Sequence, residues 1–172
     1  MKKNRLLQLV FFAAAMFLYL PAIAQNESVV TLSGNAYITS GQTAFIDEDH
    51  CVIRNWSDKE TVISFYFRTN ESGQMKIALQ AKGKSQIEVS LLGKKKKVTL
   101  NSDAMSRIEL GTFKIKNPGY VKMDVRGVKI NEGADFGSIE SVIVGGNASP
   151  VVCVTSDFSS HFGRRGPSVH LN

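Results

Sequence analysis

Apolar and polar residues alternate along three segments of this chain, and this period of two constrains its fold more than any other feature. The alternation runs through residues 74–82, 86–92 and 120–125, where the apolar positions are Met75, Ile77, Leu79 and Ala81, then Ile87, Val89 and Leu91, then Val121, Met123 and Val125. Successive side chains of a β-strand point to opposite faces, so each segment is predicted to be a half-buried strand. After Gln25 no segment of the sequence keeps an apolar period of 3.6 residues, which argues against helices.

Three further segments are apolar with less alternation. They are residues 62–67, 108–115 and 139–144, all rich in β-branched or aromatic side chains, which favours strands covered on both faces. Turn signals recur between the strands at residues 70–73, 81–84, 92–94, 117–119 and 131–133, a spacing typical of a meander or Greek key. The sequence therefore predicts an all-β domain, an antiparallel β-sandwich of about eight to ten strands.

The first 24 residues have the three parts of a cleavable signal peptide. Lys2, Lys3 and Arg5 give a positive end, residues 6–20 are almost entirely apolar, and Ala22-Ile23-Ala24 places small residues before a cleavage point. The apolar run is about 15 residues long, short of the roughly 20 that span a bilayer, so no membrane span is expected after the signal is removed. We expect cleavage after Ala24, export to the periplasm or the extracellular space, and a β-sandwich domain over residues 25–146.

The positive charge of the chain is partly a property of this signal. The full sequence has 21 Lys plus Arg against 15 Asp plus Glu, and three of the basic residues lie in residues 1–24. Without them the net charge is about +3, which gives no reason to expect nucleic-acid binding. The remaining length of about 148 residues suits one domain with one core.

Two cysteines, Cys51 and Cys153, lie near opposite ends of the predicted domain. Export would bring them into an oxidising compartment, where a disulfide closing a loop of about 100 residues could contribute about 4 to 5 kcal/mol. Two buried free thiols, which behave as small apolar side chains, are the alternative. The sequence leaves both open, because it does not show whether the two sulfurs meet.

No arrangement of residues in the sequence indicates catalysis. The three histidines, His50, His161 and His170, lack metal-ligand spacing, and the sequence has no Cys-x-x-Cys, His-Glu-x-x-His or Gly-rich phosphate loop. Cys51 and the adjacent His50 would point to opposite faces of a strand, so they make a poor nucleophile and base. We therefore predict that the protein is not an enzyme and that it needs no cofactor.

Two charged runs have both a functional and a structural interpretation. Asp47-Glu48-Asp49 offers oxygen ligands on a loop before a strand, and could hold calcium. Three adjacent acids cannot all face one ion, and no EF-hand spacing accompanies them, which favours a solvated loop. Lys94–Lys97 lies between two predicted strands and is interpreted as a solvated hairpin tip, where lysines discourage pairing at a sheet edge.

Aromatic side chains are the remaining candidates for a functional site, because flat rings can lie against the apolar faces of sugars. Tyr120 falls on the polar face of its strand together with Lys122 and Asp124. These three are our candidate carbohydrate-binding residues. Trp56 stands at the end of a strand and the start of a loop, which suits either core packing or a fourth position in such a site.

Several motifs resemble a known bacterial family. The motifs are Ser33-Gly34-Asn35-Ala36-Tyr37, Asn55-Trp56 before residues 62–68, Gly111-Thr112-Phe113, Pro118-Gly119-Tyr120-Val121 and Arg126-Gly127. Together they resemble the domain of unknown function 5077. The resemblance implies an exported protein of glycan-degrading Gram-negative bacteria, with a jelly-roll fold similar to carbohydrate-binding modules. The family has no settled active site, so the resemblance assigns no catalytic residue.

Residues 147–172 differ in composition from the rest. A linker-like stretch over residues 147–150 is followed by apolar residues 151–154 and then by residues 162–172, which resemble the opening of a second family, the domain of unknown function 3472. We expect a linker and the truncated start of a second domain here. Two hypotheses follow: a non-catalytic exported module that binds carbohydrate, or a structural module that packs against a C-terminal partner domain absent from this chain.

Overall fold

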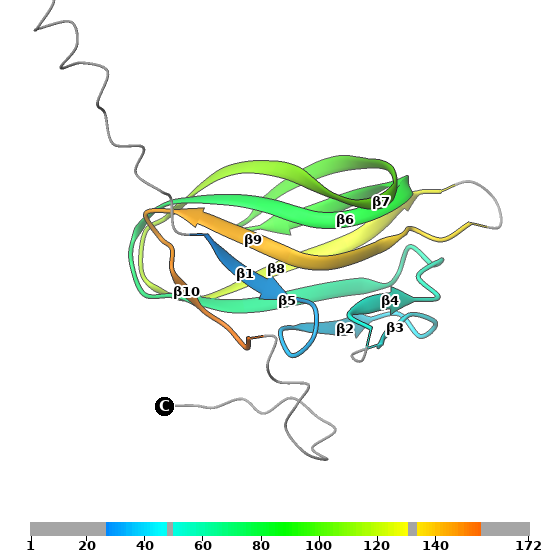
Figure 1. Cartoon of the computed structure of the whole chain (residues 1–172), viewed down its shortest axis with the longest axis horizontal. Coiled ribbons are helices and arrows are strands. Elements are labelled where there is room, and N and C mark those ends of the chain that lie inside the picture. Colours follow the sequence, from blue (N-terminus) through cyan, green and yellow to red (C-terminus); the bar gives the residue numbers. More distant parts are fainter. Residues whose placement is uncertain (1–26, 48–49, 131–133, 156–172) are drawn as a thin grey trace, which may run out of the picture.

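The computed structural model describes residues 27–47, 50–130 and 134–155 of the chain (Figure 1). The predicted signal peptide, Glu48 and Asp49 of the acidic run, and residues 156–172 with His161 and His170 lie outside the described residues.

The described residues form ten strands. In chain order these are β1 (Ser28–Thr31), β2 (Ala36–Ser40), β3 (Phe45–Asp47), β4 (Val52–Arg54), β5 (Val62–Thr69), β6 (Gly73–Leu91), β7 (Lys94–Ile115), β8 (Gly119–Lys129), β9 (Ser138–Gly146) and β10 (Val151–Val152). Every segment predicted as a strand from its apolar pattern lies in one of them, except that Leu92, the last residue of the segment 86–92, belongs to the turn after β6.

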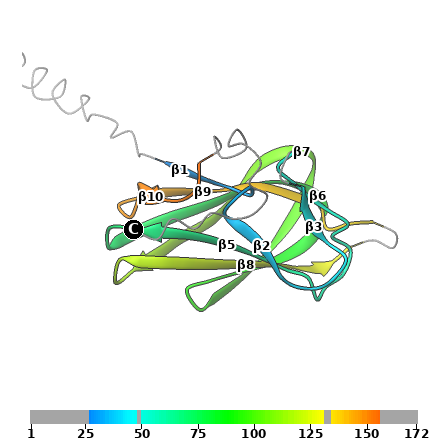
Figure 2. The same ribbon diagram turned by 90° about the horizontal axis from the view of Figure 1, so that it is seen from below.

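The strands form two layers, which we call layer A and layer B. Layer A contains β1, β9, the first part of β6 and the second part of β7. Layer B contains β5, with β8 on one edge and both β2 and β10 on the other, followed beyond β8 by the second part of β6 and the first part of β7. All these pairs are antiparallel, and β3 and β4 form a separate two-stranded sheet. Figure 2 shows β5 and β8 side by side, with β1 and β9 in the other layer.

The long hairpin of β6 and β7 belongs to both layers, which the sequence did not indicate. Residues 81–84 were predicted to be a turn, but β6 continues through them as a strand with a shift of register between Ala81 and Gly83. Gly83 has a φ of +148°, and a Cβ there would lie 3.0 Å from the Cα of Gly137 and 2.9 Å from the carbonyl oxygen of Phe136. The glycine therefore bends the strand from layer A into layer B instead of reversing the chain.

The chain does reverse at Leu92 and Gly93. These two residues connect β6 to β7, and both have positive φ angles, 49° and 74°. Two-residue hairpins of this kind match the twist of the strands that they join. The lysine run therefore starts just past the tip, on the first residues of β7.

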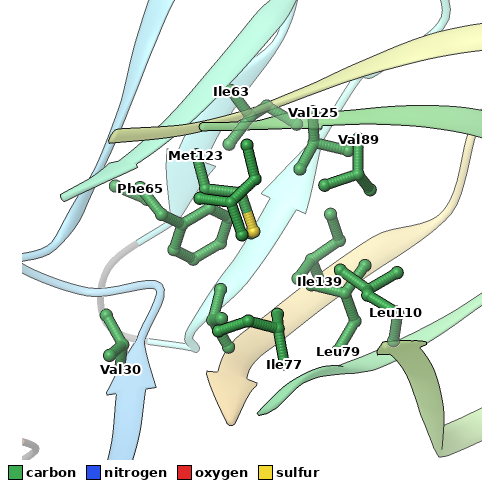
Figure 3. Close-up of a cluster of buried hydrophobic side chains, with 14 of the residues drawn as sticks. Val30, Ile63, Phe65, Ile77, Leu79, Val89, Leu110, Met123, Val125 and Ile139 are labelled. Atoms are coloured by element: carbon green, nitrogen blue, oxygen red, sulfur yellow. The ribbon is translucent and has the colours of Figure 1, made fainter. Parts of the chain in front are cut away.

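The core lies between the two layers. Figure 3 shows two facing groups of side chains. Layer A contributes Val30, Ile77, Leu79, Leu110 and Ile139, and layer B contributes Ile63, Phe65, Val89, Met123 and Val125. All ten are at most 3% exposed. The structure confirms the predicted all-β antiparallel sandwich and the period-two pattern on which it was based.

Trp56 is part of this core and not of the surface. It is fully buried, its ring lies 5.3 Å from the ring of Phe136, and its carbonyl accepts a hydrogen bond of 2.8 Å from the Phe136 amide. Gly127 of β8 leaves room for the Phe136 ring, which a Cβ at that position would overlap. This corrects Trp56 as a carbohydrate-binding candidate, because a buried indole cannot lie against a ligand.

Residues 148–154 pack against the sandwich. Ala148 is fully buried, and β10 pairs with Arg68 and Thr69 of β5. Beyond β10, the side chain of Asn35 donates from Nδ2 to the Val154 carbonyl at 2.9 Å and accepts from the Val154 amide at 2.7 Å. Gly34 fits the same contact, because a Cβ there would lie 2.8 Å from Cγ1 of Val154. The Asn35 side chain thus fastens the chain after β10 to the turn between β1 and β2.

Replacing Trp56 tests its place in the core. We expect Trp56→Ala to lower the free energy of unfolding by about 3 to 5 kcal/mol, because it leaves a large cavity. Trp56→Phe should cost less, since Nε1 has no hydrogen-bond partner among the described residues and the ring is largely retained. Urea denaturation followed by circular dichroism measures both. Tyr120→Ala, at a position 72% exposed, is the control and should stay within about 0.5 kcal/mol of the wild type.

Replacing Asn35 tests the contact with Val154. Asn35→Ala should destabilise the protein by about 1 to 3 kcal/mol, because it leaves the partly buried amide and carbonyl of Val154 without this partner. The Val154 amide should also exchange its hydrogen faster, which NMR or mass spectrometry detects. Asn101→Ala on the exposed surface of β7 is the matched control. Equal stability of Asn35→Ala and this control would contradict the assigned role.

Candidate functional site

The outward face of layer B carries most of the predicted site residues. Along β8 the side chains of Val121, Met123 and Val125 are buried, so the residues between them point away from the core. The outward residues of β5 face those of β8 in register, with Arg68 opposite Tyr120, Tyr66 opposite Lys122 and Ser64 opposite Asp124. Directly opposite residues on one sheet face have Cβ atoms about 5 Å apart, so these six side chains are neighbours.

Three tyrosines lie on this face. Tyr120 is 72% exposed and Tyr66 is 36% exposed. Tyr37 of β2 packs edge-on against Tyr66, with the ring centroids 5.8 Å apart and the planes at 65°. We call the group of outward-pointing residues Tyr37, Ser64, Tyr66, Arg68, Tyr120, Lys122 and Asp124 the tyrosine face; Ser64 among them is fully buried.

A chain of polar contacts fixes the side chains between the tyrosines. Asp124 accepts a hydrogen bond of 2.6 Å from the Ser64 hydroxyl, which itself lies 2.7 Å from the hydroxyl of Thr39. The same carboxylate oxygen, Oδ1, lies 3.1 Å from Nζ of Lys122. The hydrogen bond to Asp124 raises the pKa of Lys122, so the ammonium stays charged at neutral pH. The tyrosine face therefore offers oriented donors and acceptors beside exposed rings.

Charged residues continue this surface toward β6 and β7. Arg126 of β8 lies opposite Glu88 of β6, which in turn lies opposite Lys97 of β7. Glu88 is 9% exposed, and its Oε1 is 2.8 Å from Nη2 of Arg126 and 3.7 Å from Nζ of Lys95. One carboxylate is thus shared by two cations.

The structure brings together three of the four predicted carbohydrate-binding residues. Tyr120, Lys122 and Asp124 share the outward face of β8, whereas Trp56 lies in the core. Sequence reasoning missed Tyr66 and Arg68. Residues 62–67 were interpreted as covered on both faces, but the burial pattern of β5 alternates at its second half, where Phe65 and Phe67 are buried and Tyr66 and Arg68 are exposed. That alternation was a signal present in the sequence.

Asp47 is the one residue of the acidic run that the structure describes, and its carboxylate is already bonded to other side chains. Asp47 contacts side chains of the protein itself: its Oδ1 lies 3.0 Å from Nδ1 of His50, and its Oδ2 accepts from Nε and Nη2 of Arg54 at 3.2 Å. The His50 hydrogen bond is the main cause of the lowered pKa of Asp47. Over residues 27–47, 50–130 and 134–155, no group of three or more His, Cys, Asp or Glu side chains could hold a metal ion.

Both cysteines are free thiols in the structure. Cys51 lies in the turn between β3 and β4, in the separate small sheet, whereas Cys153 follows β10 at the edge of β5. Cys153 contacts the Val29 carbonyl at 3.6 Å, and its burial raises the pKa of its thiol. The alternative to the disulfide was two buried free thiols; in the structure the thiols are unpaired, and both cysteines are intermediate in burial.

A depression of about 300 Å³ lies away from the tyrosine face. Its lining includes Arg54, Lys82, Ser102, Asp103 and Asp135, with no aromatic ring among the lining residues. It lacks the flat apolar surface that ligand sites usually combine with polar groups.

Within the described residues no helix has the length and the hydropathy needed to cross a membrane.

Thiol titration tests the state of the cysteines. We expect two reactive thiols per chain when the unreduced protein is denatured and treated with a thiol reagent. In the native protein Cys153 should react slowly, because its raised pKa lowers the thiolate fraction. Mass spectrometry after alkylation identifies each site. A mass 2 Da lower than expected and no reactive thiol would show a disulfide instead.

The sequence matches one family model. Residues 30–149 match the family described as domain of unknown function (DUF5077). None of the curated proteins matches the chain.

Several solved structures share the fold at low sequence identity. The family 35 carbohydrate-binding module of Abf62 from Cellvibrio japonicus is 10% identical with a TM-score of 0.53, and the match covers 76% of this chain and 99% of that one. The CBM36-1 domain of a multidomain xylanase from the hindgut metagenome of Trinervitermes trinervoides is 14% identical with a TM-score of 0.51, covering 70% and 98%. These likenesses show the β-sandwich fold of carbohydrate-binding modules.

A third solved structure is a larger enzyme chain. The GH26-CBM35 β-(1,4)-mannanase of Podospora anserina is 12% identical with a TM-score of 0.52. The match covers 72% of this chain but 28% of the mannanase, so this chain corresponds to a minor part of that protein.

Proposed function

This chain belongs to the DUF5077 family, and from this premise and its exposed tyrosines we propose that it is a non-catalytic module that binds carbohydrate on the tyrosine face. The observation that carries the proposal is Tyr120. It is a large ring, 72% exposed, on β8, with Arg68 of β5 directly opposite and Lys122 two residues along the same face. Burying such a ring against a ligand would remove apolar surface from water, whereas leaving it exposed brings no stability to the fold.

The other groups of the face supply what a sugar needs beyond stacking. A pyranose has an apolar face that a tyrosine ring can cover, and hydroxyls that need donors and acceptors. Lys122 and Asp124 lie two and four residues beyond Tyr120 on the same face of β8. A contact of 3.1 Å between Nζ of Lys122 and Oδ1 of Asp124 fixes these two side chains relative to each other. Tyr66, opposite Lys122, offers a second ring with a hydroxyl.

A site on strands suits binding more than catalysis. Side chains on paired strands are held by the sheet, which favours a fixed surface for a ligand. The two carboxylates on the outward face of layer B, Asp124 and Glu88, each contact at least one cation, so neither is placed as a free acid or base. We also propose that the protein is exported and that the signal is cleaved after Ala24, on the residue pattern of its N-terminus.

Affinity electrophoresis tests the proposal. A panel of soluble polysaccharides in native gels should include at least one that retards the protein. Tyr120→Ala should weaken that retardation by about twofold to tenfold, the effect of losing about 0.5 to 1.5 kcal/mol of ring contact. Tyr120→Phe should keep most of the retardation, because it keeps the ring.

The control for this experiment is another exposed aromatic. Phe45 of β3 is 51% exposed and lies outside layer B, so Phe45→Ala should bind as the wild type does. Loss of retardation in both variants would point to non-specific adhesion. Absence of retardation across the whole panel would overturn the proposed function.

A further inference from the structure

We propose that the sugar recognised by the tyrosine face carries an anionic group, a carboxylate or a sulfate ester. This inference rests on the proposed function and adds the chemical class of its ligand.

The outward face of layer B has more cations than its own acids can neutralise. Its basic side chains include Arg68, Lys95, Lys97, Lys122 and Arg126, and its acidic side chains are Glu88 and Asp124. Asp124 pairs with Lys122, and Glu88 is shared by Arg126 and Lys95. Of these five cations, Arg68 and Lys97 have no carboxylate partner among the described residues. A surface of one sign raises the local concentration of the opposite charge.

Arg68 is the unpaired cation nearest to the exposed rings. It lies directly opposite Tyr120 and two residues along the same face from Tyr66. Its side chain donates a hydrogen bond of 3.2 Å from Nη1 to Oδ1 of Asn70, a neutral acceptor. The planar guanidinium has five donors in a fork that matches the two oxygens of an anionic group, so most of this capacity remains for a ligand.

The combination of rings and cations distinguishes this surface from a simple polyanion site. Charge alone would attract any polyanion, and an exposed tyrosine opposite the arginine would add nothing to that attraction. A sugar with an anionic substituent uses both groups, because its ring can lie on Tyr120 while the substituent reaches Arg68. The paired stretch of β5 and β8 from Val62 to Arg68 is about 20 Å long, at about 3.3 Å per residue. This length provides room for more than one sugar unit.

Native gels with four polymers test this inference on the full-length protein. The polymers are polygalacturonate, which carries carboxylates, dextran sulfate, which carries sulfate esters, neutral dextran, and polyphosphate, which is anionic and has no sugar ring. We expect retardation by polygalacturonate, dextran sulfate or both, weaker with neutral dextran, and decreasing as salt is added. Retardation by only one of the two acidic polymers identifies which anionic group is recognised.

Two variants separate the local contact from general charge. Arg68→Gln should weaken retardation by the acidic polysaccharide by about twofold to fivefold, the size of an exposed ion pair. Lys114→Gln removes the same charge from β7 in layer A, away from the tyrosine face, and should leave retardation nearly unchanged.

The other outcomes contradict the inference in distinguishable ways. Equal retardation by neutral and acidic polysaccharide, lost in Tyr120→Ala but not in Arg68→Gln, would overturn the anionic ligand and leave the proposed function standing. Retardation by polyphosphate as strong as by the acidic polysaccharides, and unaffected by Tyr120→Ala, would reveal attraction by charge alone. No retardation by any polysaccharide, here and in the broader panel, would overturn both.

Discussion

The packing of two apolar sheet faces against each other is the interaction on which the rest of this structure depends. Each layer buries one side of its strands, so alternate residues point into the core and the residues between them point to the surface. Because β6 and β7 cross between the layers, one hairpin contributes to both faces of that core. The bend at Gly83 is therefore a requirement of the sandwich, since the same strand must pair with β9 before it and with β8 after it.

The candidate site is a consequence of this packing. Burial of Val121, Met123 and Val125 fixes β8 with Tyr120, Lys122 and Asp124 pointing outward, and burial of Phe65 and Phe67 does the same for Tyr66 and Arg68. Backbone pairing then places the two sets opposite each other. No loop has to move to assemble the surface, so the face is formed before any ligand arrives, which lowers the entropy lost on binding.

Several residues of the motifs that resemble the family have roles in the architecture. Asn35 fastens the chain after β10, Trp56 fills the core, and Gly127 leaves space for Phe136. Such residues account for the fold of this chain, but they say little about the ligand. Tyr120 differs from them because it is exposed and because no element of the fold depends on its ring.

The sequence by itself determined the strands and the polarity of each face, because the period of two is a local property that neighbouring residues carry. From this alone Tyr120, Lys122 and Asp124 could be placed together on one side of β8. Only the tertiary structure decided which strands lie side by side, that residues 73–91 form one bent strand, that Trp56 faces inward, and that Arg68 stands opposite Tyr120. These depend on register and on packing between residues far apart in the chain. The apolar pattern along one strand does not identify the strand with which it pairs.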